Sequence, residues 1–149
     1  MKIALWADHA GYELKEKVKG FLEELGAEFQ DLGVNSLEPV DYPLPTADVA
    51  RQMEQGMFER AILICGTGIG TCIVANKVPG IRAANCSSHY DAVISRRHND
   101  ANVLCLGGRV LGSEVAREIV TAWLSNDFEG GRHERRLTQL KEIERRYLK

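Results

Sequence analysis

A cysteine that leads directly into a glycine-rich turn is the feature of this chain best suited to chemistry. The apolar run 61–65 predicts a short buried strand ending at Cys65, the turn 66–70 holds three glycines, and residues 72–76 are expected to be helical. Glycines let the backbone approach a ligand and turn its N–H groups inward, and the helix adds the positive end of its dipole. A thiolate held there, beside donors for a developing oxyanion, makes this segment a candidate active site.

The glycine turn alone has another explanation, since a tight strand-to-helix connection can carry an inert buried cysteine. The turn lacks the Gly-Lys-Ser/Thr ending of a nucleotide-binding phosphate loop, and Thr71 stands where cysteine phosphatases have an arginine. Cys72, Cys86 and Cys105 have no comparable surroundings, so we expect them to pack in the core.

Two histidines and three arginines are further candidates. His98 follows a predicted helix and precedes a strand, and His9 stands beside Asp8. Histidines in such places also serve as surface or capping residues, and Asp8 has a sufficient role as a helix cap. The arginines are candidate phosphate ligands because a guanidinium fork matches an anion; they are Arg109, Arg132 and Arg136.

Arg132 and Arg136 lie four residues apart at the start of the last predicted helix, so they share one face of it. The alternative for this pair is a solvated basic face that Glu134 and Glu142 neutralise. The same helix carries a narrow apolar stripe that suits packing against a partner subunit; its members are Leu137, Leu140, Ile143 and Tyr147.

The elements that must position these residues alternate between short β-branched runs and helical periodicity, which predicts an α/β fold with a parallel sheet. A proline-rich loop should cover 33–45, and Pro79-Gly80 fits the centre of a type II turn. Strands are expected over 2–6, 27–32, 60–65, 81–86 and 102–106, and helices from an Asp8 cap to Gly26 and over 46–56, 90–97 and 113–124.

Ligands of open α/β sheets bind at the carboxyl ends of the strands. The residues just beyond those ends are Asp8-His9, Cys65 with its glycine turn, and Gly107-Gly108-Arg109. They come from distant parts of the sequence, so their expected convergence is more specific than any one motif.

Length and composition set broad limits on the class of protein. The 149 residues, 44% hydrophobic, suffice for one core and predict a single domain over 1–149. A net charge of -2 and a pI near 6.1 argue against a nucleic-acid partner. We also expect no membrane segment or signal peptide, and four reduced thiols rather than disulfides or zinc ligands. The expected compartment is the cytoplasm.

Segments spread over nearly the whole chain resemble the type B ribose-5-phosphate isomerases and their relatives that isomerise allose or galactose phosphates. The set occurs in family order and is specific for the family, though much less so for the sugar. The matching segments are Asp8-His9-Ala10-Gly11, Asp41-Tyr42-Pro43, Cys65-Gly66-Thr67-Gly68-Ile69-Gly70, Ala75-Asn76-Lys77, Gly80-Ile81-Arg82-Ala83, Arg97-His98-Asn99-Asp100-Ala101-Asn102, Gly108-Arg109 and Gly130-Gly131-Arg132-His133-Glu134-Arg135-Arg136.

The resemblance implies a Rossmann-like, five-stranded parallel sheet flanked by helices, with the C-terminal helix packing on a partner subunit. It also implies a homodimer or dimer of dimers with composite sites, and aldose–ketose isomerisation without a metal or other cofactor. One branch of the family uses a glutamate within the turn in place of the cysteine. Thr71 stands at that position here, which favours the cysteine branch.

The resemblance assigns roles residue by residue. Cys65 matches the base and His98 the ring-opening residue, while Thr67 and the turn N–H groups are expected to favour the thiolate. Sugar contacts are expected from Asp8, Tyr42, Asn99 and the turn residues Gly66, Gly68, Ile69 and Gly70, and phosphate contacts from His9, Arg109, Arg132 and Arg136. Two features depart from the pattern: a bulky Trp6 in the first strand, and a loop over 34–42 that leaves the pocket length open.

We therefore expect an isomerase that interconverts D-ribose 5-phosphate and D-ribulose 5-phosphate through an enediolate. The same machinery would serve six-carbon sugar phosphates, such as allose or galactose 6-phosphate, or free rare sugars. A non-catalytic module that binds sugar phosphates is an alternative of a different class.

Overall fold

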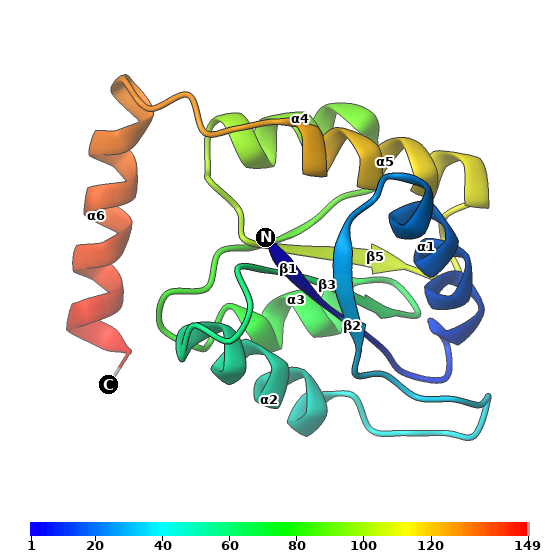
Figure 1. Ribbon diagram of the computed structural model, residues 1–149. Helices are drawn as coiled ribbons and strands as arrows, with labels where there is room; N and C mark the ends of the chain where they lie inside the picture. The colour runs from blue at the N-terminus through cyan, green and yellow to red at the C-terminus, as the bar shows by residue number, and fades with distance from the viewer. Residues whose placement is uncertain (149) are drawn as a thin grey trace.

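Five parallel strands form one sheet at the centre of the computed structural model, which describes residues 1–148 (Figure 1). Their spatial order is β2-β1-β3-β5-β4. The order in which strands are added reverses between β1 and β3, because β2 lies on one side of β1 and β3 on the other. Open α/β sheets bind ligands at such a switch point. The strands are β1 (Lys2–Ala7), β2 (Glu28–Asp31), β3 (Arg60–Cys65), β4 (Ala83–Asn85) and β5 (Val103–Gly107).

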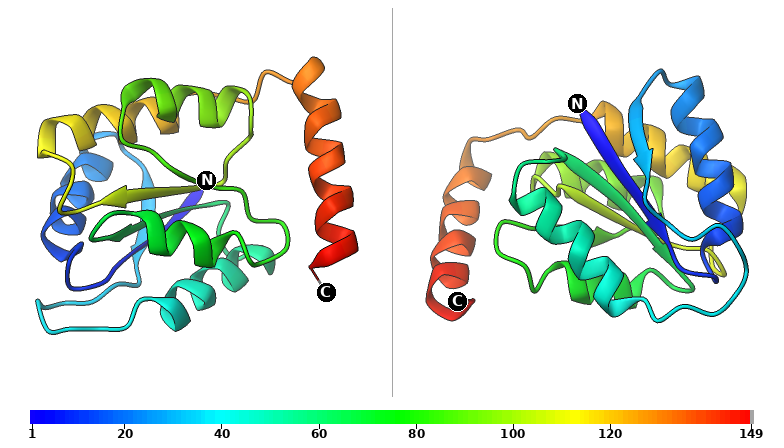
Figure 2. Two further views of the ribbon diagram at one scale, coloured as in Figure 1. Left: turned by 180° about the vertical axis from the view of Figure 1, so that it is seen from behind. Right: turned by 60° about the horizontal axis from the view of Figure 1, so that its bottom comes forward.

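Helices cover both faces of the sheet, so each central strand is apolar on both sides. One face packs against α1 (Tyr12–Glu24), α4 (His89–Arg97) and α5 (Ser113–Ser125). The other face packs against α2 (Pro43–Glu54) and α3 (Ile69–Ala75) (Figure 2). The predicted five-stranded α/β fold is confirmed.

Side chains of β1 alternate between the two faces with the period of two that a strand requires. Ile3 and Leu5 belong to the core beneath α1 and α5, whereas Ala4 and Trp6 belong to the core beneath α2. Trp6 is 3% exposed. The bulky residue that departed from the family pattern therefore fills the core instead of narrowing a pocket.

Three helices begin about three residues away from their predicted starts. α2 begins at Pro43, three residues early, because the fixed φ of proline suits the first turn of a helix. α3 begins at Ile69, inside the glycine turn, since Gly68 adopts a φ of 80° and reverses the chain there. α1 is capped by Gly11, so the cap assigned to Asp8 was wrong: the Asp8 carboxylate accepts the Gly11 N–H at 3.0 Å.

The edge strand β4 is shorter than predicted. Its outer backbone is occupied by the Asn76 side chain, which donates to Ala83 O at 3.0 Å and accepts from Ala83 N at 2.8 Å. This amide takes the place of a neighbouring strand. The turn before β4 is as predicted: Gly80 has a φ of 83°, and Ile81 N–H donates to Val78 O.

The last helix, α6 (Arg132–Tyr147), stands apart from the body at the end of an extended linker (Figure 1). Two contacts connect it to the rest of the chain: Glu144 accepts the Gly80 N–H at 2.6 Å, and the His133 ring stacks on His98. A gap of about 600 Å³ separates helix from body. The predicted apolar stripe borders this gap, and three of its members are largely exposed: Leu140, Ile143 and Tyr147. Packing on a partner stays a prediction. Among residues 1–148, no helix combines the length and apolar character needed to cross a membrane.

Candidate active site

Cys65 closes β3, and its side chain is held by groups of the turn that follows. The Gly68 N–H donates to Cys65 Sγ at 3.2 Å, and Thr71 Oγ1 lies 3.5 Å from the same sulfur. An N–H directed at sulfur stabilises negative charge there. The Thr71 hydroxyl also reaches Gly68 O at 3.3 Å, so it can accept from a thiol or, after rotation, donate to a thiolate. Both protonation states of Cys65 therefore have a partner.

The loop after β5 runs beside the glycine turn. Gly108 N–H donates to Cys65 O at 2.8 Å, and Arg109 N–H donates to Gly66 O at 3.0 Å. A side chain at Gly66 would begin 3.6 Å from the Arg109 guanidinium. Arg109 therefore lies over the turn, as the rule for the carboxyl ends of strands predicted.

Two glycines of the turn are required by what packs on them. A Cβ at Gly68 would meet the side chain of Asn85, and the positive φ disfavours any other residue. A Cβ at Gly70 would lie 2.5 Å from the ring of Tyr42. Tyr42, the residue before α2, thus lies directly on the glycine turn. Thr67 shapes the same turn, since its Oγ1 accepts the Ile69 N–H at 3.1 Å.

Asp8 and His9 complete this cluster from the end of β1. Asp8 is 5% exposed, and its N–H donates to Ile64 O in the neighbouring strand. His9 Nδ1 accepts the Val40 N–H at 3.1 Å. In a neutral ring this contact puts the proton on Nε2, which leaves a donor for an anion. The loop over 33–42 therefore sets the hydrogen-bonding state of His9.

A second cluster forms where α4 ends and α6 begins. The rings of His98 and His133 stack, with centroids 4.0 Å apart and planes 16° from parallel. Glu129 Oε1 lies 3.9 Å from His98 Nε2. Burial lowers the pKa of His133, and the neighbouring His98, Arg132 and Arg136 lower it further. Arg132 and Arg136 thus gather beside two imidazoles.

The two clusters lie at opposite ends of the parallel strands. The Cys65 edge is the boundary of the sheet formed by the carboxyl ends of the strands, and the His98 edge is the boundary formed by their amino ends. Cys65 pairs with Gly107, the last residue of β5, whereas His98 precedes Val103, the first. The four residue steps of β5 span about 13 Å. One edge gathers Cys65, Gly66, Thr67, Gly68, Ile69, Gly70, Asp8, His9, Tyr42 and Arg109, and the other gathers His98, Asn99, Arg132 and Arg136. A single chain does not bring the two sets together.

Comparison with known proteins identifies the chain. The family model described as Ribose/Galactose Isomerase matches residues 3–140. The chain belongs to this isomerase family. Ribose-5-phosphate isomerase B of Escherichia coli K12 is 48% identical over 145 residues, 97% of each chain. A D-erythrulose-4-phosphate isomerase of Pectobacterium atrosepticum is 45% identical over 132 residues, 88% of this chain and 87% of the relative.

The fold of this isomerase family member also matches a solved structure. Clostridium thermocellum ribose-5-phosphate isomerase B superimposes with a TM-score of 0.95 at 50% identity, covering 99% of both chains. The family that the quoted segments resembled is confirmed.

The histidine cluster contains the types of side chain that bind metals. The ligand atoms of His98, Glu129 and His133 all lie within 4.8 Å of one another. Imidazole lone pairs lie in the ring plane, so two stacked rings direct them side by side and not at a common point. With Arg132 and Arg136 adjacent as well, the arrangement suits proton transfer and anion binding better than a cation.

One pair of thiols, Cys72 and Cys105, could not be predicted from the sequence of this isomerase. Cys86 and Cys105 are buried as predicted, and burial raises the pKa of Cys86 to about 11. Cys72 is only half-buried, and a hydrogen bond from Cys105 lowers its pKa to about 7. Strand and helix periodicity place both residues toward the same core, but the period does not specify a contact between thiols.

Proposed function

We propose that the protein interconverts D-ribose 5-phosphate and D-ribulose 5-phosphate through an enediolate. The observation that carries this proposal is the Cys65 thiol, with the Gly68 N–H 3.2 Å and the Thr71 hydroxyl 3.5 Å from its sulfur, in a member of an isomerase family. The names of the Escherichia coli and Clostridium thermocellum relatives favour a five-carbon substrate.

The active site is composite, with Cys65 from one chain and His98 from another. The support is topological, because the sheet separates the two clusters within one chain. In a two-fold symmetric dimer, the Cys65 edge of each copy can face the His98 edge of the other copy, which completes two sites. The exposed stripe of α6 gives the second chain an apolar surface, so a homodimer or dimer of dimers is expected.

Catalysis requires ring opening before proton transfer. His98 serves as the acid–base group at the ring oxygen and anomeric hydroxyl of the cyclic sugar. Cys65 then removes the C2 proton of the open aldose, and the electrons move to the carbonyl oxygen to form the enediolate. The same thiol returns the proton to C1 while the proton of the C2 hydroxyl passes to the C1 oxygen, so that C2 becomes the carbonyl carbon of the ketose. Thr71 stabilises the sulfur in both states, as its reachable donor and acceptor positions permit.

The remaining polar residues hold the substrate. Turn N–H groups stabilise the enediolate oxygen, and one well-placed donor contributes about 3 kcal/mol in other oxyanion sites. Asp8, Tyr42 and Asn99 contact sugar hydroxyls. Phosphate is bound far from the reacting carbons, which supplies positioning; its ligands are His9, Arg109, Arg132 and Arg136. The expected compartment remains the cytoplasm, in keeping with four free thiols.

Other sugar phosphates remain candidate substrates, because a 45% identical relative is named for D-erythrulose 4-phosphate. The experiment is steady-state kcat/KM for ribose 5-phosphate, the four-carbon ketose phosphate, allose and galactose 6-phosphates, and the free sugars. We expect the highest value for ribose 5-phosphate. A higher value for another phosphate would reassign the substrate, and no turnover of any would leave a binding module.

A further inference from the structure

The turn that follows α4 and carries His98 and Asn99 is held in an unusual backbone conformation. Asp100 has a φ of 47°, and among residues 1–148 it is the one non-glycine residue with a positive φ. Aspartate tolerates this left-handed region better than most residues, but the conformation still needs support from its surroundings. The Asp100 carboxylate supplies part of that support.

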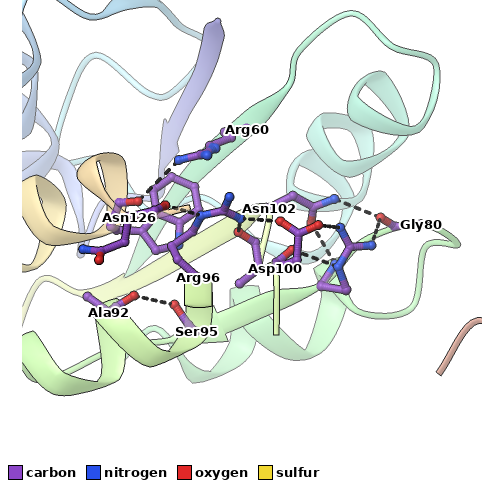
Figure 3. A network of polar contacts seen from close by, with 11 residues as sticks. Arg60, Gly80, Ala92, Ser95, Arg96, Asp100, Asn102 and Asn126 are labelled. Atoms are coloured by element: carbon purple, nitrogen blue, oxygen red, sulfur yellow. Dashed lines mark hydrogen bonds and ion pairs between the residues drawn. The ribbon is translucent and has the colours of Figure 1, made fainter. Parts of the chain in front are cut away.

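Two arginines, Arg96 and Arg82, bind the Asp100 carboxylate, and Figure 3 shows Arg96 beside it. Arg96 Nη1 donates to Asp100 Oδ1 at 2.9 Å, and Arg82 Nη2 lies 3.5 Å from Oδ2. Arg82 Nε also donates to the Asp100 carbonyl oxygen at 2.9 Å. Side chain and backbone of one residue are thus fixed together.

Arg96 binds Asp100 from the interior of the molecule. The residue is 5% exposed, and its guanidinium also donates to Ala101 O at 2.7 Å and to Asn126 O at 3.2 Å. A buried guanidinium that lacks acceptors is costly, so these contacts hold one another in place. Asn126 begins the linker to α6. Its bond to Arg96 therefore connects the turn that carries His98 to the linker that leads to His133.

Asn102 anchors the other side of the turn. Its Nδ2 donates to Gly80 O at 2.9 Å (Figure 3). Its Oδ1 accepts the Arg82 N–H at 2.8 Å. The linker is attached nearby, where Glu129 N–H donates to Arg97 O at 3.0 Å. The turn is therefore braced against α4, the loop before β4, and the linker at once.

We infer that Arg96, Asp100 and Arg82 form a clamp that positions His98 and Asn99 for ring opening, with Asp100 as its central positioning residue. The inference rests on the proposed role of His98. Asp100 itself need not touch the sugar. Its carboxylate and positive φ determine the direction in which the chain leaves α4, and so fix where the His98 imidazole stacks on His133.

The test uses Asp100→Asn in the full-length protein, because asparagine keeps the shape and tolerates a positive φ but lacks the charge. Misplacing a catalytic group by about 1 Å can cost about a hundredfold. We expect kcat/KM for ribose 5-phosphate to fall by about tenfold to a hundredfold. Solvent exchange of the C1 proton of ribulose 5-phosphate, an open-chain ketose, should continue at nearly the unmodified rate. Glu24→Gln, which breaks a remote ion pair between α1 and α5, is the control and should leave both rates unchanged.

A second readout follows the position of the imidazole directly. The side-chain NMR resonances of His98, assigned with His98→Asn, should shift in Asp100→Asn and stay in place in Glu24→Gln. Arg82→Gln perturbs the same turn from the solvent side and provides a milder variant if Asp100→Asn folds poorly. It should shift the same resonances and lower turnover of ribose 5-phosphate less.

The outcomes separate the clamp from the role of His98. If His98→Asn shows the split between turnover and proton exchange while Asp100→Asn has no effect, the clamp is overturned. Unmoved His98 resonances in both clamp variants would overturn it as well. If His98→Asn itself leaves turnover intact, the assignment of ring opening fails, and shifted resonances would still establish that the clamp positions the ring.

Discussion

The two edges of the sheet carry clusters built in different ways. The Cys65 edge is made largely of backbone: a glycine turn, the loop after β5, and N–H groups whose positions follow from strand pairing. The His98 edge is made of long or charged side chains on two helix ends and a linker. Backbone groups held by a sheet lose little freedom on binding, so they suit the proton-transfer step. Arginines and histidines suit recognition of a charged, variable part of a ligand.

The largest expected effect is that of Cys65→Ala, which disables the Cys65 edge alone. The change deletes the proposed base but leaves the backbone of the turn intact, so turnover should fall by at least about a thousandfold, within the usual range for an acid–base group. Thermal unfolding and binding of inorganic phosphate should change little. Cys72→Ala is the matched control, since its thiol lies outside the Cys65 contacts. Near-normal turnover by folded Cys65→Ala would remove the base from the mechanism.

Gly70→Ala tests whether the Cys65 edge depends on close backbone packing. The added methyl would lie 2.5 Å from the Tyr42 ring, so the ring or the turn must move. We expect kcat/KM to drop by about tenfold to a hundredfold. Gly20→Ala is the control, because nothing lies within 4 Å of a Cβ there, and alanine in helix α1 should stabilise by about 0.5–1 kcal/mol. Equal activity of the two variants would contradict the packing argument.

Arg136→Ala tests recognition by the other edge. One charge-assisted contact contributes about 1.5–3 kcal/mol, so KM for ribose 5-phosphate should rise by about tenfold to a hundredfold. Competitive inhibition by inorganic phosphate should weaken in parallel, while a neutral polyol inhibitor should be unaffected. Arg145→Ala, on the same helix but away from the histidines, is the control. An unchanged KM would take Arg136 out of the phosphate site.

The smallest effect concerns the thiol pair beside the glycine turn. A pKa near 7 means that the Cys72 thiolate fraction, and hence alkylation by iodoacetamide, should rise as pH increases through 7. Cys86, with its pKa raised to about 11, should stay unlabelled across the same range. Peptide mass spectrometry of protein labelled between pH 6 and 9 follows both sites. A Cys72 labelling rate that rises only above pH 9 would contradict the hydrogen bond from Cys105.

Periodicity and the rule for strand ends suffice to predict most of the Cys65 edge. The parallel sheet places Asp8, Cys65 and Arg109 together, because all three lie at or just beyond the carboxyl ends of strands. The stack of His98 on His133 lies beyond such reasoning, since it depends on the path of the linker between α5 and α6. The clamp around Asp100 also lies beyond it, because Arg82 reaches Asp100 from the loop before β4, eighteen residues away in the sequence. The prolines of 33–45 predicted a loop up to Pro45, whereas α2 begins at Pro43, because proline suits the first turn of a helix.

The central claim is that each active site joins Cys65 of one chain to His98 of another. It is tested by mixing Cys65→Ala with His98→Asn under conditions of demonstrated subunit exchange. Half of the dimers are then mixed, each with one doubly damaged and one intact site, so about a quarter of the unmodified activity should return. If both residues of a site belonged to the same chain, every site would keep one lesion. The mixture would then be no more active than the two variants measured separately, and that result would contradict the account.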